Sequence, residues 1–199
     1  MDTKPLILDE LMPRYDAAIA EHRIVDADPK AVIEAARDLD FMTVHTPLLD
    51  AAVWARTLPA KLRGRFVPPP PQVRLTGGTG EGLPGWLMLG ERAGEEVAFG
   101  AVGVFWRSEI RWDNVAPEEF AAFTEPGRGK IACNFSALAY GADRTVLTFE
   151  CRVATTDGRS RRAFMRYWTI IRPFVGHIMR AALATIATGV TRGSHQTTA

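Results

Sequence analysis

One segment of the sequence combines several arginines with a stripe of aromatic and apolar residues. It reads TDGRSRRAFMRYWTIIRPFVG, from Thr156 to Gly176. Its arginines are Arg159, Arg161, Arg162 and Arg166. These side chains could bind nucleic-acid phosphates, but a DNA-recognition helix exposes its readout residues, whereas this one carries apolar residues that could cover a sheet. We therefore expect the arginines to be a solvated flank, and we expect no nucleic-acid partner.

Acid–base catalysis would need polar side chains aimed at one point, and the candidates are scattered along the chain. They are His22, His45, His177, Arg107, Glu109, Glu150, Asn134, Tyr140 and Tyr167. They show no catalytic-triad spacing. His45, between two expected short helices, is a weak candidate for a general base and could equally cap a helix. Glu150 and Arg152 have the opposite parity to Phe149, which predicts a cross-strand charge pair on the outer face of a sheet.

Metal and phosphate sites find little support in the residue spacing. No two histidines have the i, i+4 spacing that brings two ligands together on a helix, and Cys133 and Cys151 would need a distant third partner. We expect both cysteines to be reduced core residues. The string GGTGEGLPG lacks the Gly-Lys-Ser/Thr ending of a phosphate-binding loop and indicates a surface loop. No metal or cofactor is expected.

Composition places the chain among ordinary globular proteins. Its 199 residues are 47% hydrophobic and 24% charged, and 24 basic against 23 acidic residues leave a formal charge of +1. No overall field would attract polyanions. The N-terminus has no apolar stretch typical of a signal peptide, and no run approaches the length of a membrane span. We expect one domain in a soluble, cytoplasmic protein without a membrane span.

The elements that would position these residues follow from the local patterns. A first strand is expected over about 20–26, and Asp28-Pro29 and Thr46-Pro47 each predict the start of a short helix. A loop rich in proline and glycine covers 67–85, with a possible strand at 73–76. A short helix is expected at Pro117. Alternating runs then predict further strands at 86–92, 95–106, 108–115, 130–138 and 145–155.

The run TVLTFECRVAT has one apolar face, so it needs an apolar cover. The C-terminal segment, whose helix Asp157 is expected to cap, is the one element long enough to provide it. Pro173 should bend or break that helix, and a bend would let it follow a curved sheet. We also predict that the turn AYGAD joins the last two strands and that Cys133 and Cys151 lie on neighbouring strands.

This arrangement resembles the START-like (SRPBCC) superfamily of helix-grip proteins, which includes Bet v 1-like, polyketide cyclase and lipid-transport members. The segments GAVGVFWR, EEFAAFTEPGRGKIACNF, LTFECRVATTDGRSRRAFMRYW and IRPFVGHIMRAAL look like those of bacterial members. The resemblance covers roughly Tyr15 to Ile186 and implies an α+β fold, in which six or seven antiparallel strands wrap around a long C-terminal helix. The expected domain is 15–190, after an N-terminal extension at 1–14 and before a disordered tail at 191–199.

The resemblance further implies an internal cavity for a small apolar or aromatic molecule. The candidate lining residues are Trp54, Phe99, Phe105, Phe135, Phe149, Phe164, Trp168, Ile171 and Val175. Plain core packing is the alternative for each of them. A cyclase or hydrolase-like enzyme using the same cavity, and an interaction protein with a filled cavity, are the alternative functions. A homodimer is possible.

Overall fold

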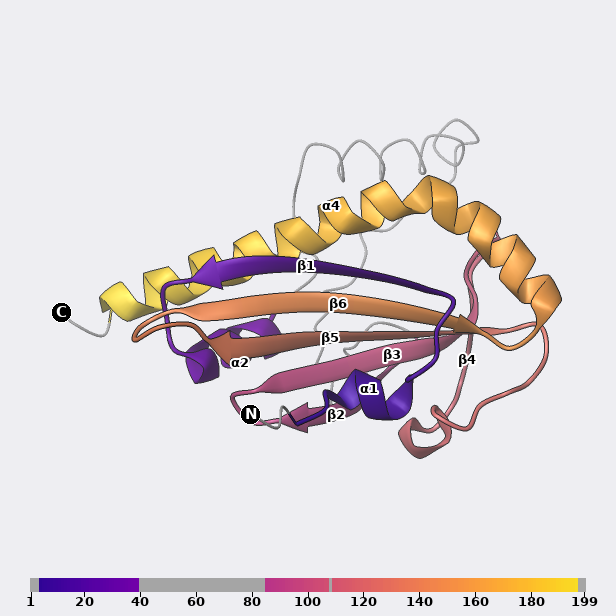
Figure 1. Cartoon of the computed structure of the whole chain (residues 1–199), viewed down its shortest axis with the longest axis horizontal. Helices are drawn as coiled ribbons and strands as arrows, with labels where there is room; N and C mark the ends of the chain where they lie inside the picture. The colour runs from indigo at the N-terminus through magenta and orange to yellow at the C-terminus, as the bar shows by residue number, and fades with distance from the viewer. Residues whose placement is uncertain (1–3, 40–84, 108, 197–199) are drawn as a thin grey trace, which may run out of the picture.

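An antiparallel sheet of six strands forms the centre of the computed structural model, which describes residues 4–39, 85–107 and 109–196 (Figure 1). The strands are β1 (Ala17–Val25), β2 (Trp86–Arg92), β3 (Glu96–Val104), β4 (Arg111–Asp113), β5 (Gly129–Ala139) and β6 (Thr145–Thr155). Their order across the sheet is β1-β6-β5-β3-β2, with β4 also paired to β3. The first strand therefore pairs with the last one.

The connection between β5 and β6 confirms the predicted turn. The Tyr140 N–H donates to the Arg144 carbonyl at 2.7 Å, and Gly141 has a φ of +75°, a left-handed conformation that glycine adopts without strain. The register of the two strands places Cys133 directly opposite Cys151. The two cysteines lie on neighbouring strands, as predicted.

Four helical segments accompany the sheet within the described residues. They are α1 (Ile7–Leu11), α2 (Pro29–Arg37), the 3₁₀ turn η2 (Pro117–Glu119) and α4 (Gly158–Gln196). The Asp28 carboxylate caps α2 by accepting the Ala31 N–H at 3.1 Å, and Asp157 caps α4 through the Ser160 N–H at 2.9 Å. The starts of α2, η2 and α4 agree with the sequence analysis. The second short helix expected after β1 and the loop over 67–84 lie outside the described residues.

Helix α4 has 39 residues, a length of roughly 58 Å at the standard helical rise. It continues through Pro173 and forms an arch over the sheet (Figure 1). Pro173 cannot donate a backbone hydrogen bond, and this loss favours a bend in the helix. The helix does not break at Pro173, which was the other outcome expected from the sequence. The helix extends to Gln196, past the domain boundary expected at 190, and the expected domain bounds stay a prediction.

By length and composition, the stretch Gly158–Thr191 of α4 could also cross a membrane. The core helix of a soluble protein meets the same criterion, and α4 packs here against β1, β6 and α2. The sequence analysis found no apolar run as long as a membrane span. The expected absence of a membrane span stays a prediction.

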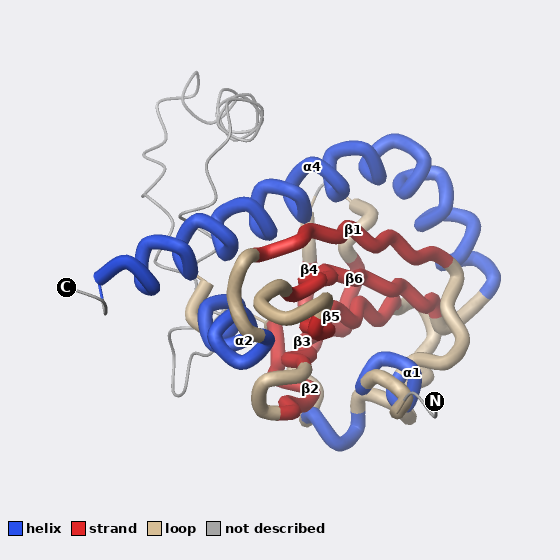
Figure 2. Tube along the Cα trace, turned by 60° about the vertical axis from the view of Figure 1, so that its left-hand side comes forward, coloured by secondary structure: helices blue, strands red, loops and turns tan. Residues whose placement is uncertain are grey.

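Both faces of the sheet are covered, and two apolar clusters result. Helices α2 and α4 cover the inner face, and α1 lies on the opposite, outer face (Figure 2). The inner cluster contains Phe99, Phe149 and Phe164, and the outer one joins Leu8 of α1 to Phe120 beside η2. The sequence analysis treated 1–14 as an extension and missed α1, although residues 4–12 are part of the folded body.

Candidate functional site

A cavity of about 340 Å³ lies between the inner face of the sheet and α4, within the usual range for small-molecule sites. Its wall consists of apolar and aromatic side chains from five strands or their ends and from one face of α4. They are Trp86, Phe99, Phe105, Ile110, Trp112, Ile131, Cys133, Phe149, Cys151, Val153, Phe164, Tyr167, Trp168, Ile171, Val175, Ile178 and Met179. Ile110 is 39% exposed and lies at the rim.

Strand alternation and helical spacing explain why these side chains meet. Phe99 pairs with Cys133, and Cys133 with Cys151, so these inward positions share one face of the sheet. Phe164, Trp168 and the apolar residues that follow at helical spacing form the facing stripe of α4. The cavity is therefore the space between a concave sheet and a bent helix.

Most of the residues that the sequence analysis proposed for a cavity wall lie in this wall. They are Phe99, Phe105, Phe149, Phe164, Trp168, Ile171 and Val175. Trp54 and His45 lie outside the described residues. A role in ligand binding stays a prediction for every member of the set.

Phe135 differs from the other members because it is not part of the cavity wall. Its side chain is fully buried, and its ring centroid lies 4.2 Å from that of Phe149 and 5.9 Å from that of Phe99. Helix α2 packs against β5 and covers this end of the inner face. Phe135 is therefore packed in the core beside this cavity, and a role for it in ligand binding stays a prediction.

Two tryptophans of the wall were missed. The ring centroids of Trp86 and Trp112 are 5.9 Å apart, and those of Trp112 and Phe105 are 5.8 Å apart. Phe105 in turn meets Phe164 of α4 at 5.8 Å. These contacts form a continuous aromatic wall. Both tryptophans lie in predicted strands. The alternation of side chains along each strand could therefore have identified them as inward-facing.

The polar candidates that lie in the described residues do not converge on the cavity. His22 hydrogen-bonds Thr148 at 2.9 Å on the outer face, and Glu109 pairs with Arg111 at 2.9 Å. Tyr140 is exposed in the β5–β6 turn. Of the nine polar candidates, Tyr167 alone is a lining residue within the described parts of the chain.

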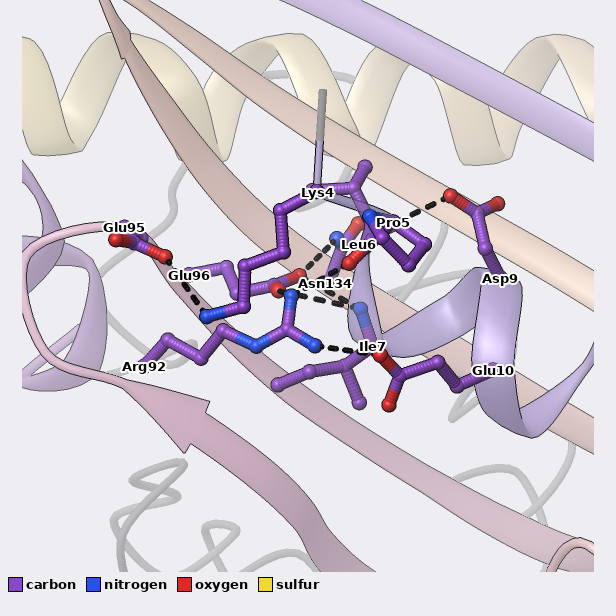
Figure 3. A network of polar contacts seen from close by, with 10 residues as sticks. All are labelled: Lys4, Pro5, Leu6, Ile7, Asp9, Glu10, Arg92, Glu95, Glu96 and Asn134. Atoms are coloured by element: carbon purple, nitrogen blue, oxygen red, sulfur yellow. Dashed lines mark hydrogen bonds and ion pairs between the residues drawn. The ribbon is translucent and has the colours of Figure 1, made fainter. Parts of the chain in front are cut away.

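A buried carboxylate lies on the other side of the sheet, where it holds the N-terminal segment (Figure 3). Glu96 is 1% exposed and accepts the Ile7 N–H at 3.1 Å, an Arg92 guanidinium N–H at 2.5 Å and the Asn134 amide at 3.3 Å. Arg92 also binds Glu10 at 2.8 Å. Within the described chain, Asn134 Oδ1 has no hydrogen-bond partner. This network anchors α1 and has no connection to the cavity wall.

A second outer-face group surrounds Arg152. Its guanidinium donates to Glu150 and to Asp9 of α1, each at 2.7 Å. Burial alone would lower the pKa of Arg152, but hydrogen bonds to Glu150 and Asp9 raise the pKa above its ordinary value. Glu150 and Arg152 thus form the outer-face charge pair that was expected, although both belong to β6 and the contact across the fold is made by Asp9.

The two thiols are the buried titratable groups of the cavity wall. Cys133 is 4% exposed and Cys151 is 8% exposed, and both are free. Burial raises the pKa of the Cys133 thiol well above its ordinary value, and the hydrogen bond with Cys151 raises it further. A protonated Cys133 thiol and the buried Cys151 therefore belong to the cavity wall. No group of three or more potential metal ligands occurs in the described parts of the chain.

The element order and the sheet topology described above are those of the expected helix-grip fold. No protein-family model matches the chain, and no curated protein matches it. Zhui aromatase/cyclase from a Streptomyces species is a similar solved structure, with 12% identity, coverage of 88% of this chain and 94% of that one, and a TM-score of 0.33.

Two further solved structures are similar to a comparable degree. TTHA0849 from Thermus thermophilus has 11% identity, covering 89% of this chain and 99% of that one, with a TM-score of 0.32. CalU16 from Micromonospora echinospora has 14% identity, covering 88% of this chain and 84% of that one, with a TM-score of 0.28. Neither an activity nor a ligand is transferred from these proteins.

Proposed function

We propose that this protein binds a small, uncharged and largely aromatic molecule in the cavity beneath α4. The observation that carries the proposal is the wall itself, which combines about 340 Å³ of space with a lining in which no described residue is charged. A ligand charge would lose its hydration there without gaining a partner, at a cost of several kcal/mol. An apolar ligand has no such cost.

The aromatic residues of the wall favour a flat ligand. Rings pack best in offset or edge-to-face arrangements, and Trp112, Phe149, Phe164 and Trp168 present rings on several sides of the cavity. The wall also contains Tyr167 and three tryptophans, whose hydroxyl and indole N–H groups are hydrogen-bond donors. One or two hydroxyl or carbonyl groups on an aromatic framework are therefore compatible with the site.

The alternatives are less well supported. A cyclase or hydrolase would need at least two polar side chains converging in the cavity. The described wall contains Tyr167 and two cysteines, without a carboxylate or an imidazole. An interaction protein with a filled cavity would lack the observed volume. Ligand binding is the function that the wall supports best.

Two measurements test the proposal. Native mass spectrometry of freshly purified protein should show a retained small-molecule adduct, and the neutral dye Nile red should bind and brighten when titrated into emptied protein. Trp168→Phe, at a lining position that is 8% exposed, should stay folded and change the dye affinity. Ile170→Ala is the matched control, because Ile170 lies on the same helix and is 81% exposed. An equal dye affinity in both variants and the wild type would contradict the proposal.

A further inference from the structure

Cys133 and Cys151 form a pair of thiols inside the cavity. They are directly opposite each other in the antiparallel pairing of β5 with β6, so their side chains leave the sheet on the same face. Opposite Cβ atoms in such a pair are about 4.5–5.5 Å apart, which lets one atom bridge both sulfurs. Both residues belong to the cavity wall, and their thiols are hydrogen-bonded to each other.

The surroundings of this pair determine which chemistry it can perform. No lysine, arginine or histidine is among the described lining residues that could stabilise a thiolate, and burial keeps the Cys133 thiol protonated at neutral pH. A single neutral thiol is a poor nucleophile. A suitable ligand therefore binds both sulfurs at once and forms a product without net charge.

We propose that Cys133 and Cys151 are a dithiol site for neutral trivalent organoarsenicals, with the organic substituent in the aromatic part of the cavity. This inference names a ligand class for the cavity and rests on the proposed function, in that the cavity must admit small molecules. The arsenical, in its hydrated form with two hydroxyl groups, exchanges both As–O bonds for As–S bonds. Each thiol proton leaves with one hydroxyl group as water, and arsenic remains trivalent.

The electrostatics of the cavity favour this product over metal complexes. The dithiolate of an organoarsenical is neutral, so its burial leaves no unpaired charge. A Cu(I) ion held by two thiolates would carry a net negative charge, and zinc would need four ligands. An aryl substituent on arsenic would lie close to Phe99, which is opposite Cys133 on β3, and to Phe149, which precedes Cys151 on the same inner face.

Phenylarsine oxide is the probe for this site, used on the full-length protein kept reduced by a phosphine. We expect one arsenic per chain by native mass spectrometry, loss of both thiols in a titration, and reversal by the competing dithiol dimercaprol. Cys133→Ser and Cys151→Ser should each weaken binding by at least about 100-fold, because the second As–S bond is intramolecular. Retained affinity in either single variant, or two arsenicals per chain, would overturn the proposal.

A parallel titration separates this inference from the proposed function. Nile red should bind to the wild type, and phenylarsine oxide should displace the dye. Dye binding without any arsenical binding would refute the dithiol site alone. Failure of both the dye and the arsenical to bind would refute the proposed function and this inference together. The thiol titration on the wild type gives a result even if a variant fails to fold.

Discussion

Phe135 and Phe149 pack ring against ring across β5 and β6, with their centroids 4.2 Å apart, yet of these two residues only Phe149 borders the cavity. Phe135 is fully buried at the end of the inner face that α2 covers. The inner face therefore has a packed half and an open half. Substitutions in the two halves should have separable effects on stability and on ligand binding.

Phe135→Ala should lower the free energy of unfolding by about 3–5 kcal/mol, as expected for a buried aromatic truncation, without changing the dye affinity of the molecules that stay folded. Phe149→Leu should change the dye affinity as well, because it alters the wall itself. Urea unfolding and Nile red titration of both variants test this. A changed affinity in folded Phe135→Ala would place its ring in the site after all.

The arginines at the start of α4 should contribute little to stability. Arg162 is exposed, and Arg162→Gln should change the free energy of unfolding by no more than about 0.5 kcal/mol. Arg161 is 63% exposed and pairs with Asp16 at 2.9 Å, so Arg161→Gln should cost up to about 1 kcal/mol. Urea unfolding measures both values. Strong salt-dependent DNA binding that disappears in the double variant would disprove a solvated flank.

The cap of α4 should make stability depend on pH. Hydrogen bonds from the Ser160 and Gly127 backbone N–H groups and from the Ser160 hydroxyl lower the pKa of Asp157 well below its ordinary value. Because the folded-state pKa is depressed, this stabilisation is fully present above the unfolded-state pKa of about 3.9 and is lost as the pH falls toward the folded-state pKa.

Asp157→Asn keeps an acceptor oxygen but removes the titration. Its melting temperature should therefore fall less than that of the wild type between about pH 5 and about pH 3. Asp143→Asn, in the exposed β5–β6 turn, is the matched control and should follow the wild type. If the melting temperatures of the wild type and Asp157→Asn fell equally with pH, the cap carboxylate would not contribute to the pH dependence of stability.

Local patterns in the sequence were enough for much of the fold. The alternation in TVLTFECRVAT predicted β6 with its observed bounds, Thr145–Thr155, and its inward face. Asp157 indicated the start of α4, and the AYGAD turn indicated the pairing of β5 with β6. These features depend on residues within a few positions of each other, which is why the chain alone determines them.

The tertiary structure decided what depends on residues far apart in the chain. Helix α1 has five residues, too few to be stable alone, and is held by Glu96, 89 positions away from Ile7. Phe135 and Phe149 have the same inward parity, and the packing of α2 against β5 places one in the core and the other at the cavity. Alternation determines which face a side chain occupies. Whether space beside it stays empty depends on how closely the sheet, α2 and α4 approach one another.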